Sequence, residues 1–214
     1  YKHTQEKERT KELFMSGLES LPDGFVELRD ALGKIFPTPK VFITEYPDLV
    51  RDAEAKYCDE APKKDLLERI TADEAEWASD TVINNLNCEV RRAAETHRWV
   101  YVGGIESSFL RHGYCAGDQA WVNTFDKARE VQGTSRCRET SFGDCIFSPG
   151  SVHPNVPGHQ CLATRILLAL QANGVASDLN LIRPTDPCVQ TPPRTIARQC
   201  LLDTRPKAPS IRVF

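Results

Sequence analysis

The chain has 214 residues, of which 40% are hydrophobic and 27% are charged, and its formal net charge is -3 at pH 7. This size suits a globular protein with one sizeable core. The slight negative charge gives no general attraction to nucleic acid or anionic membranes, and no apolar run approaches the roughly 18 residues of a membrane span. Small molecules or neutral polymers are therefore the expected partners.

The first forty residues predict two helical stretches with a break between them. From Thr4 to Met15 most residues are charged, which indicates a solvated helix or a loose leading segment. After the helix-breaking sequence Pro22-Asp23-Gly24, apolar residues follow a helical spacing up to Ile35, and Pro37 ends it. We therefore expect the first packed helix to begin after Gly24.

Two short apolar segments have the composition of buried parallel strands. These are residues 40–44 (KVFIT) and residues 99–104 (WVYVGG), and between them lies the long helical pattern of residues 72–97, either continuous or with one interruption. This order predicts two adjacent parallel strands joined by a right-handed helical crossover. Because such sheets usually have several strands, we expect an N-terminal segment or a second chain to complete the sheet.

The second half of the chain predicts loops, one helix and an extended tail. Residues 105–151 are rich in glycine, cysteine and polar residues, whereas residues 158–171 have a helical apolar face that Asn173-Gly174 closes. Residues 175–214 are rich in proline and arginine and have no helical period. We interpret residues 1–174 as one α/β unit and residues 175–214 as a disulfide-pinned extension or the beginning of a further module.

The cysteines indicate disulfide bonds rather than a metal site or a thioredoxin-like motif, because no two of them form a C-x-x-C pair. Disulfides predict an oxidising compartment, and hence a secreted or periplasmic protein. We expect all eight cysteines to be oxidised, with a Cys188–Cys200 bridge closing the tail. They are Cys58, Cys88, Cys115, Cys137, Cys145, Cys161, Cys188 and Cys200.

The sequence HPNVPGH, which begins at His153 and precedes the last predicted helix, resembles the last conserved block of the SGNH, or GDSL, hydrolases. The resemblance is to their secreted bacterial and fungal lipase and esterase branch. The segments VFITEYPDL, LNCEVRRAAE and HGYCAGDQAWVN resemble other parts of that domain in the same order. The likeness extends over about residues 25–174. It implies a three-layer α/β/α, flavodoxin-like domain with a parallel sheet, present here as its C-terminal half.

The resemblance implies an ester hydrolase in which His153 is the general base. In that family a serine in a Gly-Asp-Ser turn attacks the ester, and neither this turn nor the Gly-x-Asn-Asp oxyanion motif can be placed in the chain. The serine is therefore expected outside it. Family members commonly have Asp three residues before the histidine, where this chain has Gly150. A backbone carbonyl such as that of Gly150 would then hold Nδ1–H and leave Nε2 free.

The resemblance implies no cofactor and no metal, and a small-molecule or carbohydrate ester is the expected substrate. Asp118, Trp121 and Asn155 are candidate substrate contacts, although a tryptophan beside a cysteine also suits packing and Asn155 also suits bracing of the turn. His159 is expected to be structural. The pair His153 and His159 lacks helical ligand spacing and a third ligand, which argues against a metal site.

Two alternatives stay open. The sequence FGDC, which ends at Cys145, looks like the nucleophile block with cysteine in place of serine, but it follows the last predicted strand and therefore favours a disulfide. The second function is a non-catalytic SGNH-like domain that binds carbohydrate or protein, for which Gly150 in place of the acid is the best support.

Overall fold

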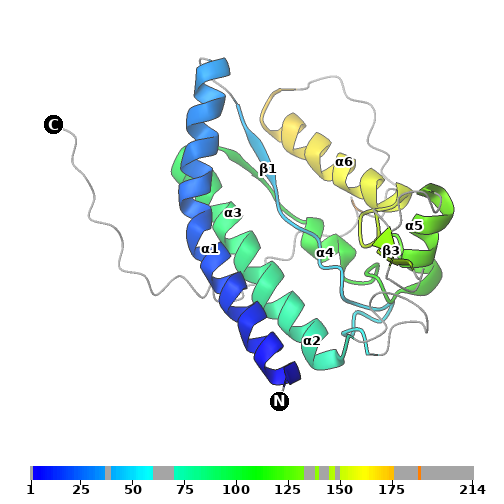
Figure 1. Cartoon of the computed structure of the whole chain (residues 1–214). Helices are drawn as coiled ribbons and strands as arrows, with labels where there is room; N and C mark the ends of the chain where they lie inside the picture. The colour runs from blue at the N-terminus through cyan, green and yellow to red at the C-terminus, as the bar shows by residue number, and fades with distance from the viewer. Residues whose placement is uncertain are drawn as a thin grey trace.

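A computed structural model describes residues 2–36, 40–59, 70–132, 138–139, 145–147, 150–175 and 188. Figure 1 shows its helices and strands. In chain order they are α1 (Lys2–Ile35), β1 (Phe42–Thr44), α2 (Ala72–Glu76), the π-helix η1 (Trp77–Ile83), α3 (Asn84–His97), β2 (Val100–Val102), α4 (Ile105–Phe109), the 3₁₀ helix η2 (Gly117–Gln119), α5 (Phe125–Gln132), β3 (Arg138–Glu139), β4 (Cys145–Phe147) and α6 (Val156–Ala172).

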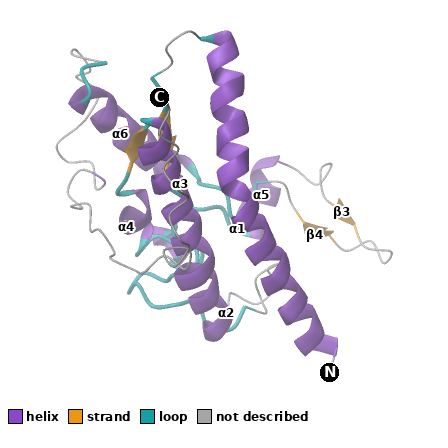
Figure 2. Ribbon diagram, turned by 90° about the vertical axis from the view of Figure 1, so that its left-hand side faces the viewer, coloured by secondary structure: helices purple, strands orange, loops and turns teal. Residues whose placement is uncertain are grey.

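The two predicted strands do lie side by side and parallel. Phe42 is opposite Val100 and Thr44 is opposite Val102. The connection between them contains α2, η1 and α3, so the long helix predicted over residues 72–97 is confirmed, and η1 is an interruption in it. The chain is thus an α/β protein with a small parallel sheet. Figures 1 and 2 show this sheet between α3 and α6, both of which contact the two strands.

The region of residues 105–151 is less irregular than expected. It contains α4, η2 and α5, and β3 and β4 pair as antiparallel strands. Across the described residues, no helix combines the length and apolar character needed to span a membrane.

Helix α6 runs opposite to β1. The Lys40 ammonium, just before β1, donates to the carbonyl of Asn173, just after α6, at 2.7 Å. The end of α6 therefore lies beside the beginning of β1, and the beginning of α6 lies towards the carboxyl ends of the strands. Ligands of open α/β sheets bind outside these carboxyl ends. The residues before α6 are placed on that side of the sheet.

The expected break at Pro22-Asp23-Gly24 is wrong, because α1 continues through it. A proline removes one backbone hydrogen bond from a helix, but packing on both sides can outweigh this loss. Phe14 packs edge-on against Trp77 at 5.8 Å between ring centroids, and Phe25 packs in the same way against Trp99 at 6.3 Å. These contacts hold α1 against η1 before the proline and against the segment between α3 and β2 after it.

The main core lies where β2, α4, the segment of residues 114–122 and α6 meet. Its buried members include Cys161 on α6 and Cys188, which are joined by a disulfide with 5.5 Å between their Cα atoms. The predicted Cys188–Cys200 bridge is therefore wrong. Short sequence separation favours loop closure in the unfolded chain, but the bridge forms between the cysteines that folding brings together.

The other described cysteines are also oxidised. Cys58 is bonded to Cys115, Cys88 is disulfide-bonded as well, and no described cysteine is free. Cys137, Cys145 and Cys200 were also expected to be oxidised, but their side chains lie outside the described part of the structure. The disulfides are compatible with an extracytoplasmic location.

Asp48, whose place after Tyr46-Pro47 suits a turn or helix cap, is the centre of a buried ion cluster. It is fully buried, its Oδ1 accepts from the Val50 N–H at 3.3 Å, and its Oδ2 accepts from Arg51 Nε at 2.6 Å and from Ser79 Oγ at 2.7 Å. It therefore caps a turn and also joins the segment after β1 to η1.

A glycine-to-alanine substitution tests whether α1 is continuous. Gly24 has no atom within 4 Å of the place where a Cβ would stand. Gly24→Ala should therefore raise the free energy of unfolding by about 0.5–1 kcal/mol, because alanine loses less backbone entropy in a helix. Urea unfolding measures the change.

Gly117→Ala is the matched control. Gly117 also has open space around it, but its φ of +58° is a left-handed conformation that should cost alanine about 1–2 kcal/mol. A loss of stability in Gly24→Ala similar to that in Gly117→Ala would show that the chain turns at Gly24.

Candidate functional site

The turn that carries His153 is hydrogen-bonded to a neighbouring segment. The N–H of Val152 donates to the carbonyl of Asn123, the N–H of Asn123 donates to the carbonyl of His153, and the N–H of Asn155 donates to the carbonyl of Trp121, each at 2.9 Å. This pairing forms a small antiparallel bridge. The backbone of the turn is thus held from both sides of the histidine.

The ring of His153 is anchored by a backbone carbonyl. Its Nδ1 lies 3.0 Å from the carbonyl oxygen of Ser151, whereas the carbonyl of Gly150 accepts the main-chain N–H of His153 at 3.2 Å. The expected class of partner is present, but the expectation that it is Gly150 is wrong. The Gly150 oxygen accepts the backbone bond that forms the turn. The carbonyl of Ser151, the next residue, faces the ring instead.

This anchoring selects one tautomer of the neutral ring. When Nδ1–H donates to Ser151, Nε2 carries no proton and is an acceptor. His153 is exposed, so this nitrogen lies on a side chain that a ligand can reach. The arrangement suits a proton acceptor.

The backbone before His153 is strained. Val152 has a φ of +57°, although a β-branched residue rarely adopts a left-handed conformation. Such a residue costs on the order of 1–3 kcal/mol and persists only where surrounding bonds hold it, often at functional sites. Gly150 has a φ of +90°, which glycine adopts freely. An aspartate at this position would be strained, which is a physical reason for glycine there.

Asn155 holds the turn in place. Its Oδ1 accepts from the N–H of Gly158 at 3.2 Å and so caps α6, and its Nδ2 donates to the carbonyl of Ala120 at 2.8 Å. The bracing interpretation is confirmed. Both ends of the amide are engaged with the protein backbone, rather than being open to a substrate.

Gly158 permits close packing of α6 against the same segment. A Cβ at this position would collide with the carbonyl oxygen of Trp121 and would lie 3.0 Å from the Cβ of Pro154. Only glycine lets the first turn of α6 come this near to the Trp121 backbone. The N-terminus of α6 and the His153 turn are therefore seated on residues 120–123.

Trp121 is a core residue rather than a wall of an open cleft. It is 8% exposed, its indole stacks on the ring of His112 with 3.7 Å between centroids, and Phe109 packs edge-on against it at 5.3 Å. Burial lowers the pKa of His112, whose Nδ1 lies 2.7 Å from the carbonyl of Gln119. The packing alternative for Trp121 is the one the structure favours.

The other candidates are not brought to the histidine by any contact of their side chains. Asp118 is exposed on η2, and His159 is exposed on α6, where its N–H donates to the Asn155 carbonyl at 2.8 Å. The side chain of Cys145 lies outside the described residues. Within the described part of the chain, no group of three or more histidine, cysteine, aspartate or glutamate side chains could hold a metal ion.

A buried polar cluster that the sequence analysis missed lies at the carboxyl ends of the two strands. Glu45 follows β1, and its Oε1 accepts from the backbone N–H of Glu106 at 2.8 Å, while its Oε2 accepts from the hydroxyl of Tyr101. Asn87 of α3 donates to Glu106 Oε2 at 3.0 Å. Burial, and then the charge of Glu45, raises the pKa of Tyr101.

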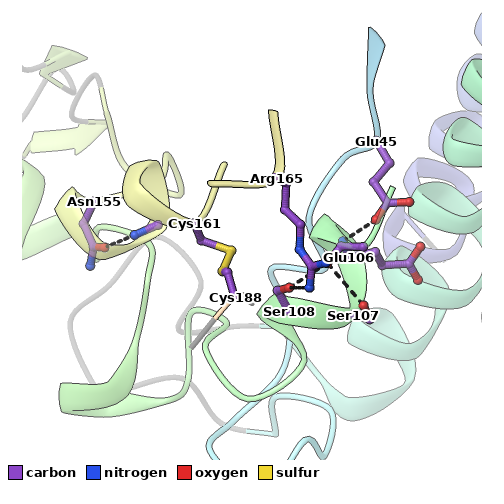
Figure 3. The surroundings of a disulfide bond; sticks show 10 residues. Glu45, Glu106, Ser107, Ser108, Asn155, Cys161, Arg165 and Cys188 are labelled. Carbon is purple, nitrogen blue, oxygen red and sulfur yellow. Dashed lines mark hydrogen bonds between the residues drawn. A yellow bond between two sulfur atoms is a disulfide. The ribbon is translucent and has the colours of Figure 1, made fainter. Parts of the chain in front are cut away.

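Arg165 links α6 to the same region. Its Nη2 donates to Ser108 Oγ at 2.9 Å, and its guanidinium lies against Gly104, which has a φ of +84°. Figure 3 shows Arg165 with Ser108 and Glu106, and the Cys161–Cys188 bridge and Asn155 to one side. The contacts of this cluster are with the protein itself, so it joins the strand ends to α4 and α6. An acidic residue directly after the first strand, Glu45, and another four residues after the second, Glu106, were the signal that could have revealed it.

No protein-family model, no curated protein and no solved structure matches this chain. Inference about its function therefore depends on the residues and geometry of the His153 turn.

Removing the Asn155 amide should loosen the turn. Asn155→Ala loses the cap of α6 and the bond to Ala120, so the free energy of unfolding should fall by about 1.5–3 kcal/mol. Asn155→Ser keeps a capping oxygen and should lose less. Urea unfolding of both variants measures the difference.

Val156→Ala is the matched control, because Val156 is the next residue and is 70% exposed. Its effect should lie within about 0.5 kcal/mol of zero. If Asn155→Ala is as stable as Val156→Ala, Asn155 does not hold the turn.

Proposed function

We propose that this chain is the C-terminal half of an SGNH-type serine ester hydrolase in which His153 is the general base. The observation that carries the proposal is the state of the His153 ring. Its Nδ1 faces the Ser151 carbonyl at 3.0 Å, its side chain is exposed, and its turn precedes α6 on the carboxyl-end side of the parallel strands.

The proposed reaction begins with a serine supplied by a segment outside these residues. Nε2 of His153 takes the proton from the serine hydroxyl while the serine oxygen attacks the ester carbonyl carbon. The protonated ring then gives the proton to the leaving alcohol as the ester C–O bond breaks. Water hydrolyses the acyl-enzyme by the same two proton transfers. Acyl or acetyl esters of small molecules or carbohydrates are the proposed substrates.

The carbonyl of Ser151 replaces the usual carboxylate in this proposal. A carbonyl accepts the Nδ1–H bond that orients the ring, which is the geometric part of the acid's role. It carries no full charge and therefore stabilises the imidazolium less. The strained Val152 and the backbone bonds on both sides of His153 support a pre-organised ring.

The surrounding fold also agrees with the proposal. A parallel pair of strands between α3 and α6 has the layer order of an α/β/α sandwich, and the disulfides suit a secreted or periplasmic enzyme. A non-catalytic SGNH-like domain that binds carbohydrate or protein is the second candidate. It is favoured by Gly150, which leaves the turn without the carboxylate of a full triad.

The test compares two histidines of the same turn and helix. In the protein that also carries the proposed nucleophile, His153→Ala should lower hydrolysis of p-nitrophenyl acetate and butyrate by about 10²–10⁴-fold, the usual contribution of a positioned base. His159→Ala should keep wild-type turnover, because His159 is exposed and its backbone N–H, which the substitution retains, makes the bond to Asn155. Thermal melts of each variant establish that it is folded.

Equal activity in the three proteins would remove His153 from the mechanism. If the wild type neither hydrolyses these esters nor reacts with a fluorophosphonate probe of activated serines, the binding-domain candidate is favoured instead.

Restoring the family's acid should not restore a triad. Gly150→Asp places a side chain on a backbone with φ +90° and should cost about 1–2 kcal/mol of stability. Because Ser151 already accepts Nδ1–H, activity should not rise. Gly150→Ala has the same backbone strain without a carboxylate, so it separates the two effects. A rise in turnover in Gly150→Asp alone would show that a carboxylate can reach the ring.

A further inference from the structure

The outer edge of β1 has hydrogen-bonding groups that are not used within the described residues. On its inner edge, the Val41 carbonyl accepts from Val100 N–H at 2.8 Å and the Glu45 N–H donates to the Val102 carbonyl at 3.3 Å. Parallel pairing alternates along a strand, so the N–H and C=O groups of Phe42 and Thr44 point to the other edge. In the described part of the chain, β1 has no strand neighbour there.

Large apolar side chains are exposed at both ends of the same strand. Ile35 and Phe36, at the end of α1, are 69% and 53% exposed, and Tyr46, two residues after β1, is 50% exposed. Val175, which follows α6 at the end where Lys40 contacts it, is 52% exposed. Exposed apolar groups beside an open strand edge mark an interaction surface.

The order and direction of the elements indicate which strand would bind. Helix α1 leads into β1 from the opposite direction, and it lies on the α3 side of the sheet (Figures 1 and 2). A helix that precedes a parallel strand in this way is the crossover from another parallel strand. When successive right-handed crossovers lie on the same side of a sheet, each new strand is added on the same side of the one before it. A strand before α1 would therefore lie beside β1, on the side away from β2.

The opposite edge of the sheet lacks these features. Arg98 lies before β2, in a left-handed conformation, and Trp99 is partly buried against Phe25. Among the described residues at the ends of β2, no large apolar side chain is exposed. A charged residue at a strand end discourages pairing with another chain.

We propose that the outer edge of β1 binds a third strand, apolar and parallel to β1, from a polypeptide segment that precedes α1. The main-chain groups of Phe42 and Thr44 bind its backbone, and the exposed side chains around β1 cover its ends. This inference rests on the half-domain part of the proposed function and deepens it by assigning the edge and the direction of the added strand, whereas it does not require that His153 is catalytic.

The experiment attaches an extra strand to the N-terminus of the 214-residue chain and asks whether it pairs with the outer edge of β1. The probe is a copy of residues 40–45 (KVFITE) fused before Tyr1 through a flexible Gly/Ser linker of about 20 residues, which spans roughly 25 Å. The control fusion has the same linker and a Gly/Ser/Asn segment in place of the strand. Amide hydrogen exchange is measured by NMR in the 214-residue chain and in both fusions.

In the 214-residue chain, the amides of Phe42 and Thr44 should exchange at least about tenfold faster than that of Ile43, which faces β2. The KVFITE fusion should slow both by about tenfold or more, and the control fusion should slow neither. Thr44→Pro removes an outward N–H and should abolish the effect of the fusion. If Thr44→Pro does not fold, the proposal is decided by the exchange rates of the 214-residue chain, the KVFITE fusion and the control fusion.

Three results would overturn the proposal. Phe42 and Thr44 could be as protected as Ile43 in the 214-residue chain, which would mean that the edge is already covered. The KVFITE fusion could leave both rates unchanged. Light scattering could also show a dimer of the 214-residue chain that Thr44→Pro dissociates, which would assign the edge to a second copy. None of these results depends on esterase activity.

Discussion

The close approach between the first turn of α6 and the backbone of Trp121 is the constraint on which the candidate site depends. Gly158 permits this approach, and Asn155 caps α6 and bonds to Ala120 in the same place. The Trp121 ring is itself anchored in the core. The His153 turn is thus built on the core although its imidazole is exposed, which is how a surface residue acquires a defined orientation.

The same arrangement explains why a carboxylate is not needed to orient the histidine. The bonds of Val152 and His153 to Asn123 hold the turn in a strained conformation, and this conformation directs the Ser151 carbonyl to Nδ1. Orientation by a fixed carbonyl keeps the geometry of a triad but gives up part of its electrostatic stabilisation. A low turnover and a binding function are both consistent with such a site, and activity measurements distinguish them.

Much of the local structure could be predicted from the sequence. The strands of residues 40–44 and 99–104, the interrupted helix between them and the helix after Asn155 follow from apolar spacing, capping residues and glycines, which act within a few residues. The break at Pro22 was wrong because Phe14 and Phe25 contact aromatic residues far along the chain. The buried Glu45 cluster was missed because its members come from β2, α3, α4 and the segment after β1, which only folding brings together.

The sequence by itself determined the two parallel strands, the interrupted helix between them, the last helix and the histidine in a tight turn before it, since these depend on local propensities and hydrogen bonds. Only the tertiary structure decided that Cys161 pairs with Cys188, that Ser151 rather than Gly150 faces the ring, and that Trp121 is packed inside. The disulfide pairing, the partner of the ring and the burial of Trp121 each depend on which residues the fold brings into contact. A pairing between distant residues is set by the packing of α6 on the core, and no short sequence pattern specifies it.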